Sequence, residues 1–125
     1  MDFKNTKAFS SFSVRDLGET KKFYNQTLGL EVSETDEGLI LKTKGNEIFI
    51  YPKPDHTPAT FTVLNFVVED VDRAVDELIK MGIHFQIYDK GELQTDNRGV
   101  FQGKPKIAWF KDPSGNFLSI LENEN

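Results

Sequence analysis

The chain has 125 residues, a formal net charge of -5, a pI near 5.0 and no cysteine. This composition excludes disulfides, thiolate nucleophiles and cysteine-ligated zinc, and the scattered Lys and Arg residues do not form the concentrated basic face that nucleic acid needs. No apolar run approaches the ~18 residues of a membrane span and the polar N-terminus lacks a signal-peptide core, so we expect one cytoplasmic domain over residues 1–125, without nucleic-acid or membrane partners.

The first half of the chain predicts one helix among four strands. Asp16 lies where its carboxylate can cap a helix over about 17–28, and Gly29 lies where a left-handed residue ends it. Runs of apolar and β-branched residues predict strands at 9–14, 30–33, 38–43 and 47–52. We therefore predict a β-α-β-β-β module over about 8–52.

The second half predicts the same order of elements. A linker with two prolines, residues 53–60, leads into a module over about 61–122. Its helix is indicated by an apolar stripe with Asp70 before it and Gly82 after it. The stripe consists of Val71, Ala74, Val75, Leu78 and Ile79. Strands are expected at 61–68, 83–88, 106–110 and 116–121.

Two connections in the second half carry further information. The stretch between Asp89 and Pro105 is polar, contains glycine and is longer than most loops, which is typical of a lid or a binding loop. The sequence DPSGN at 112–116 predicts a turn between the last two strands.

The two helices and their flanking strands are similar to each other. Residues 12–30 read FSVRDLGETKKFYNQTLGL and residues 66–83 read FVVEDVDRAVDELIKMGI. Asp16 precedes Gly29 by 13 residues, and Asp70 precedes Gly82 by 12. Equal order and nearly equal spacing indicate that one unit was duplicated.

These segments, together with the ending IAWFKDPSGNFLSILE, resemble the vicinal oxygen chelate superfamily. That family includes glyoxalase I, extradiol dioxygenases, fosfomycin-resistance transferases, methylmalonyl-CoA epimerase and bleomycin-resistance proteins. The resemblance covers roughly residues 8–122. It implies an α+β fold of two tandem βαβββ modules, whose curved mixed sheets surround a central cavity with the helices outside.

The resemblance also implies where a metal would bind. In the enzymes of the family, four cavity side chains hold a divalent metal, usually His or Gln, Glu, His and Glu. Two of these positions lie seven residues before the aspartates that cap the helices, one lies seven residues after Asp112, and the fourth lies on the EIFIYP strand to within a residue or two. Here they are Phe9, Val63, Ser119 and Ile50. None is a metal ligand of any strength, so neither a metal nor another cofactor is expected.

Strand alternation indicates which other side chains would face the cavity. Ser11 shares a face with Phe9, Asn65 with Val63, and Phe117 with Ser119. Trp109 is placed to border the cavity and to stack on a planar or cationic ligand. The expected ligand pocket is therefore Phe9, Ser11, Ile50, Val63, Asn65, Trp109, Phe117 and Ser119. Whether these residues line an open cavity or fill it is left open by the sequence.

Three functions are compatible with this pattern. The favoured one is a metal-free protein that binds an apolar or planar small molecule and, as bleomycin-resistance proteins do, forms a homodimer. A metal-dependent enzyme of the glyoxalase or dioxygenase type with a non-standard site is the alternative. The third is an interaction domain without a ligand. No Ser-His-Asp spacing or other catalytic constellation is present, so no catalytic residue is predicted.

Overall fold

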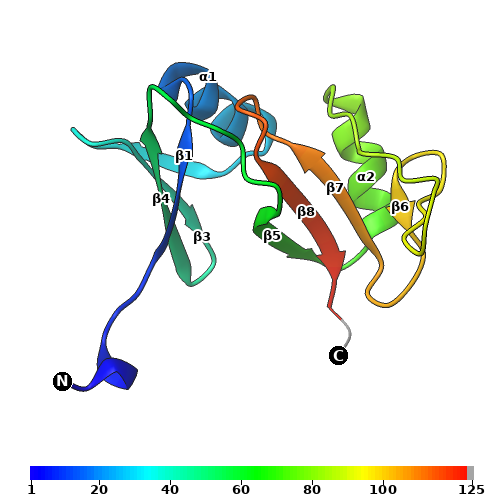
Figure 1. The fold of residues 1–125 in the computed structure, drawn as a ribbon, viewed down its shortest axis with the longest axis horizontal. Coiled ribbons are helices and arrows are strands. Elements are labelled where there is room, and N and C mark those ends of the chain that lie inside the picture. Colours follow the sequence, from blue (N-terminus) through cyan, green and yellow to red (C-terminus); the bar gives the residue numbers. More distant parts are fainter. Residues whose placement is uncertain (124–125) are drawn as a thin grey trace. The chain divides into compact units, whose positions relative to one another are not determined.

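The computed structural model describes residues 1–123, which form two compact units divided between Thr57 and Pro58. Each unit has a sheet of four strands and one main helix (Figure 1). The division falls inside the stretch 53–60 that the sequence marks as a linker. No helix among the described residues is long and apolar enough to cross a membrane.

In the first unit, the strand order is β1-β4-β3-β2. The strands are β1 (Ser10–Val14), β2 (Glu31–Glu34), β3 (Leu39–Thr43) and β4 (Asn46–Pro52). β1 runs parallel to β4, and the other pairs are antiparallel. The segment before β1 runs away from the strands and has the short helix η1 (Phe3–Asn5) near the N-terminus (Figure 1).

The predicted first helix is present, but it changes its winding halfway. Regular helix α1 (Leu17–Lys22) continues as the π-helix η2 (Phe23–Thr27), in which the N–H of Leu28 donates to the carbonyl of Phe23. Asp16 caps the start, where its Oδ1 accepts from the N–H of Glu19 at 3.0 Å. Gly29 follows the end with φ 75°, as expected for a left-handed residue.

The core of the first unit lies between α1 and one face of the sheet. Phe12 and Val14 of β1 are buried, and they alternate with more exposed serines. Phe12 contacts the fully buried Tyr24 of η2, with ring centroids 6.4 Å apart. The remaining core side chains of this unit are Leu39, Leu41, Ile48 and Ile50.

The second unit repeats this topology, with the order β5-β8-β7-β6 and a parallel β5–β8 pair. Its elements are β5 (Thr62–Val68), α2 (Val71–Lys80), β6 (Val100–Phe101), β7 (Ile107–Lys111) and β8 (Phe117–Glu122). The α+β class and the duplicated modules are therefore confirmed. In each module the helix lies between the first two strands, so the chain can return and start the second strand in the same direction as the first. The last three strands then alternate in direction, which makes the fourth strand parallel to the first.

Helix α2 begins and ends where the sequence predicts. Asp70 Oδ1 accepts from the N–H of Arg73 at 3.1 Å, and Gly82 has φ 95°. Val71 and Val75 are fully buried against the sheet, but Ile79 is 42% exposed. The prediction that Ile79 packs in the stripe is therefore wrong, because the residue lies in the last turn of the helix, beyond the part that the sheet covers.

The predicted strand at 83–88 is also wrong. Only Phe85 forms a bridge there, with Phe110 of β7, and the N–H of Gln86 donates to the carbonyl of Trp109. The rest of that edge of β7 pairs with β6, which lies in the stretch predicted to be a loop. Residues 85–86 and strand β6 both form backbone hydrogen bonds with the same edge of β7. Because β7 has only five residues, neither segment can pair along its whole length.

The predicted turn at 112–116 is built around one buried carboxylate. Asp112 Oδ1 accepts from the N–H groups of Ser114 and Asn116 at 2.9 and 3.0 Å. Its Oδ2 accepts from the side-chain amide of Asn116 at 3.1 Å. All three residues are at least 95% buried, so the turn is a rigid part of the second unit.

Candidate binding groove and helix-free sheet faces

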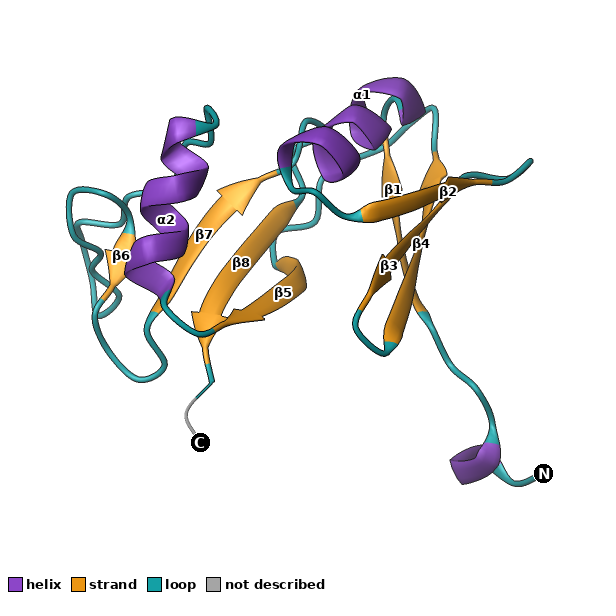
Figure 2. Ribbon diagram, turned by 180° about the vertical axis from the view of Figure 1, so that it is seen from behind, coloured by secondary structure: helices purple, strands orange, loops and turns teal. Residues whose placement is uncertain are grey.

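Each sheet has one face packed on its own helix and one face turned away from it (Figure 2). On the first sheet, the face without a helix carries Ser11 and Ser13 of β1, Ile40 of β3, and Phe49 and Tyr51 of β4. We call this the first helix-free face. The register puts Ser11 opposite Phe49 and Ser13 opposite Tyr51, so hydroxyls and aromatic rings lie side by side.

A groove with a volume of about 450 Å³ lies on this face. Its floor and walls are mostly apolar, with Phe9, Ile40 and Phe49 as the largest exposed contributors. The full set of lining residues is Lys7, Phe9, Thr35, Glu37, Ile40, Glu47, Ile48 and Phe49. A volume of this size suits a small organic molecule, and the mixture of apolar surface with few polar groups is typical of such sites.

Next to the groove, aromatic and polar groups continue along the same face. Phe49 stacks on Tyr51 with ring centroids 6.1 Å apart and an interplanar angle of 18°. Ser13, opposite Tyr51, forms a hydrogen bond of 2.7 Å between its Oγ and Nδ1 of His56. Two stacked aromatic rings therefore lie on this face, with a hydroxyl and an imidazole group beside Tyr51.

A second hollow, of about 520 Å³, adjoins the groove on the side of the β3–β4 hairpin. It shares Lys7, Phe9 and Glu47 with the groove and adds the charged residues Glu31 and Lys42, which lie opposite each other on β2 and β3. Phe9 therefore forms part of two hollows at once, and 64% of its surface is exposed.

The second sheet has a corresponding helix-free face, built from β5, β8 and β7. Asn65, Ser119 and Trp109 lie side by side across these three strands. Ser119 Oγ donates to Asn65 Oδ1 at 2.5 Å, and Trp109 packs edge-on against Tyr88 with centroids 5.7 Å apart. Amide, hydroxyl and indole groups are thus grouped on one surface.

The structure places most of the predicted pocket residues on these two faces. Asn65, Trp109 and Ser119 lie together, and the ring of Phe117 lies beside them with the ammonium group of Lys111 5.0 Å from its centroid. In the first unit, Phe9 lines the groove and Ser11 lies on the same face.

Two predicted pocket residues are placed differently. Ile50 is fully buried opposite Phe12 on the face that the helix covers, so it does not line the groove. The alternation along β4 gives that place to Phe49 and Tyr51 instead. Val63 is the extra residue at a bulge between Thr62 and Leu64, where the pairing of β5 with β8 shifts register.

Seven groove residues were missed by sequence reasoning, namely Lys7, Thr35, Glu37, Ile40, Glu47, Ile48 and Phe49. In EIFIYP the residues of both faces are large and apolar, so alternation alone does not tell the core face from the groove face. The useful signal was Glu47, because a charged residue at the start of the strand marks the face that Phe49 and Tyr51 share.

The donor set for the metal implied by the family does not fit. The four corresponding positions hold Phe9, Ile50, Val63 and Ser119, of which only the serine has an oxygen to offer. Within residues 1–123, no three His, Asp or Glu side chains are grouped so that they could hold a metal ion. Divalent cations of the zinc or iron type need several imidazole or carboxylate ligands, so no catalytic step is assigned to a metal here.

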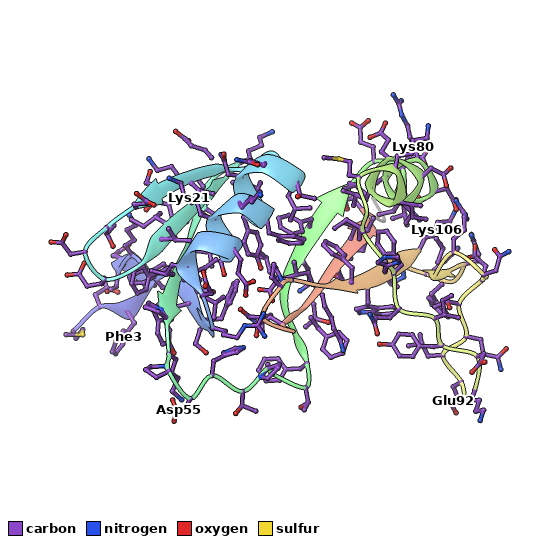
Figure 3. All side chains as sticks on the ribbon, turned by 90° about the horizontal axis from the view of Figure 1, so that it is seen from above. Phe3, Lys21, Asp55, Lys80, Glu92 and Lys106 are labelled. Carbon is purple, nitrogen blue, oxygen red and sulfur yellow. The ribbon has the colours of Figure 1, made fainter. Side chains whose placement is uncertain are left out.

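A cluster of charged residues fixes the long stretch that follows α2. Arg98 donates to Asp72 and, at 2.9 Å, to Asp76, both on the helix. Lys106 donates to Asp72 Oδ2 at 2.7 Å and lies beside α2 (Figure 3). Asp96 Oδ1 accepts from the backbone N–H of Arg98 at 2.9 Å. The C-terminal part of the stretch between α2 and β7 is therefore held to the helix by ion pairs. The interpretation of this stretch as a lid or binding loop did not predict that attachment.

The pKa values in this cluster follow from its hydrogen bonds. Those from Lys106 and then Arg98 lower the pKa of Asp72 to about 2. Burial opposes ionisation of Asp96, but hydrogen bonds from the backbone N–H groups of Val100 and Arg98 outweigh it and lower its pKa. The bond to Asp72 raises the pKa of Lys106. All of these groups are charged at neutral pH, so the cluster supports structure and supplies no titrating acid or base there.

The chain is an α+β protein of two repeated modules. Each module has one mixed sheet and one main helix, and the helix covers only one face of the sheet. The model of the Glyoxalase/Bleomycin resistance protein/Dioxygenase superfamily matches residues 9–120. The chain belongs to this superfamily. A search of curated proteins gave no significant match.

Solved structures show the same fold. Fosfomycin resistance protein FosX from Listeria monocytogenes is 15% identical, with a TM-score of 0.70, covering 95% of this chain and 93% of its own. A glyoxalase family protein from Enterococcus faecalis is 24% identical, with a TM-score of 0.69 and coverage of 97% and 100%. TnmS3, an antibiotic binding protein from Streptomyces sp. CB03234, is 21% identical, with a TM-score of 0.66 and coverage of 96% and 98%.

Proposed function

We propose that this chain is a metal-free small-molecule-binding protein whose groove on the first helix-free face holds an apolar or planar ligand. The observation that carries the proposal is the groove itself, with Phe9 exposed and Ile40 and Phe49 half-buried around a volume of about 450 Å³. Apolar side chains that remain exposed around a hollow gain free energy when a ligand removes them from water.

Two of the structural relatives support this kind of function. TnmS3 is an antibiotic binding protein, and FosX is a fosfomycin resistance protein. They share the fold of this chain at low sequence identity, so they support the class of function and leave the ligand undefined. At three of the four positions that hold metal ligands in the enzymes of the family, Phe9, Ile50 and Val63 are apolar, and Ser119 alone is polar. This exchange supports a site that works by shape and apolar contact.

The helix-free face of the second unit is proposed as a binding surface in its own right. Asn65, Trp109, Phe117 and Ser119 supply an amide, an indole, a phenyl ring and a hydroxyl on adjacent strands. Trp109 offers the largest planar surface of the four, suited to stacking on a ring. A homodimer is the expected assembly of the protein, and light scattering at several protein concentrations checks it.

Thermal melting against a panel of planar and apolar compounds tests the proposal. A ligand that binds the folded state raises the melting temperature by mass action. The variant Phe9→Ala should abolish most of that rise, whereas Phe61→Ala, which removes a ring of similar exposure outside the groove, should leave it unchanged (64% and 68% exposed). If no compound raises the melting temperature, or if Phe9→Ala responds like the parent, the groove is not the binding site.

The metal-free part of the proposal has its own test. The protein is titrated with Ni²⁺, Zn²⁺, Mn²⁺ and Fe²⁺ in a calorimeter. Weak binding without defined stoichiometry is expected, because Phe9, Ile50 and Val63 offer no donor atoms. Tight binding of one ion per chain would contradict the proposal and favour a metal-dependent enzyme with a non-standard site.

A further inference from the structure

We infer that the groove selects organic cations, meaning small molecules with a positively charged group attached to an apolar or aromatic body. The inference rests on the proposed function, since it names the class of ligand for the same groove. It is carried by the charged residues that line the groove and by the aromatic rings beside them.

Three charged side chains line the groove: Lys7, Glu37 and Glu47. None of the three takes part in an ion pair with another residue of the described chain 1–123. Other acidic residues of the same unit are paired, for example Glu34 with Lys21 at 3.2 Å. The groove lining therefore has two carboxylates and one ammonium group. The adjoining hollow adds Glu31 and Lys42, of which Lys42 lies opposite Glu47 on β3, so the two hollows together remain one unit negative.

The position of Lys7 does not cancel this charge. Lys7 lies on the exposed segment before β1, and a single ammonium group neutralises at most one carboxylate. An anionic ligand would meet two like charges for one opposite charge, whereas a cationic ligand meets the reverse. The chain as a whole, at a net charge of -5, adds a field of the same sign, which raises the local concentration of cations.

The aromatic rings favour the same class of ligand. Phe9 is largely exposed, and Phe49 is half-buried in the wall of the groove, where it stacks on Tyr51. The faces of such rings attract ammonium and guanidinium groups, and they also pack against a planar body. The carboxylates thus attract the charged group of an organic cation, and the aromatic rings pack against its apolar body.

Calorimetry with three matched probes tests the inference: 2-naphthylmethyl-trimethylammonium, 2-naphthylmethanol and 2-naphthylmethanesulfonate. The cation should bind roughly 10-fold more tightly than the sulfonate at low salt, and the difference should shrink as salt screens the carboxylates. Glu37→Gln and Glu47→Gln should each weaken binding of the cation by about 3-fold to 10-fold while leaving the alcohol unchanged.

Glu92→Gln is the matched control, since it removes the same charge from a residue that does not line the groove. Glu92 lies at the outer end of the long stretch between α2 and β6 (Figure 3). Its effect on the cation should stay below about 2-fold, as expected for an exposed, screened charge that is not part of the groove lining. Melting curves check that all three variants are folded. They should be folded, because the substituted side chains are exposed.

The outcomes separate this inference from the proposed function. If the alcohol and the sulfonate bind as tightly as the cation, and Phe9→Ala weakens all three, the groove binds small molecules but does not select cations. If Glu92→Gln weakens the cation as much as Glu37→Gln does, only the net charge matters and the inference is overturned. If none of the probes binds up to its solubility limit, the proposed function fails with it.

Discussion

Ser119 and Asn65, on the adjacent parallel strands β8 and β5, are joined by a hydrogen bond of 2.5 Å from Oγ to Oδ1. Ser119 is fully buried, whereas Asn65 is exposed. The bond satisfies a hydroxyl that would otherwise be costly to bury, and it fixes the Asn65 amide with its nitrogen free to donate. A position that holds a metal ligand in the enzymes of the family thus anchors a polar side chain in this chain.

This bond should be measurable by a double-mutant cycle. We expect Ser119→Ala and Asn65→Ala each to lower the free energy of unfolding, and the pair to show a coupling of about 1 kcal/mol. Denaturation with urea, followed by fluorescence of Trp109, measures all four proteins. Strictly additive effects would mean that the two side chains do not stabilise each other.

Asp112 should be among the most sensitive polar positions in the second unit. Asp112→Ala leaves the N–H groups of Ser114 and Asn116 without this acceptor inside a buried turn. We expect a loss of roughly 2–4 kcal/mol in the free energy of unfolding. The control is Asp55→Ala on the exposed linker, which should change stability by less than about 0.5 kcal/mol. Equal effects would show that burial of the turn carries no energetic weight.

Gly38 should not tolerate a side chain. A Cβ atom there would lie 2.1 Å from the carbonyl oxygen of Ile50, a backbone atom of β4 that cannot rotate away. We expect Gly38→Ala to cost roughly 1–3 kcal/mol, as overpacking does in well-packed cores. Gly18→Ala is the comparison, because its Cβ would meet Asp16 Oδ1 at 3.3 Å, a side-chain atom that can shift. The helix propensity gained, about 0.5–1 kcal/mol, is offset in part by displacement of this capping oxygen, so the net change should be smaller than for Gly38→Ala.

Acid should weaken the attachment of the stretch around Arg98 to α2. The pKa of Asp72 is about 2 in the folded protein and 3.8 ordinarily, so the unfolded chain takes up this proton first as the pH falls. Its stabilising contribution is complete above about pH 4 and is lost between about pH 4 and pH 2. Asp96 adds to the loss in the same direction.

Hydrogen exchange of residues 96–106 between pH 5 and pH 2.5, corrected for the intrinsic rate, checks this prediction. Asp72→Asn should weaken protection already at pH 5, by less than about 1 kcal/mol because the carboxylate is one-third exposed. Its protection should then change less with pH than that of the parent. A parent protein with equal protection at both pH values would contradict the assignment.

The sequence by itself determined the repeated order of elements. Asp16 and Asp70 cap helices, and Gly29 and Gly82 follow them with positive φ, because capping and left-handed turns depend on neighbours within a few residues. The turn at Asp112 was predictable for the same reason. Strand alternation and the family resemblance also placed Asn65, Trp109 and Ser119 in one expected pocket, but they did not set the register between the strands.

The tertiary structure alone decided which apolar face of β4 meets the core. Ile48, Phe49 and Ile50 are all large and apolar, so their hydrophobicity does not put Phe49 outside and Ile50 inside, and the charge of Glu47 is only a weak local signal for the outer face. It also decided that β6 forms at Val100–Phe101 and that residues 83–88 contribute only a bridge, because both segments compete for one edge of β7. The groove and its unpaired carboxylates depend on how strands that are distant in the sequence pair with each other. The local sequence does not determine that pairing.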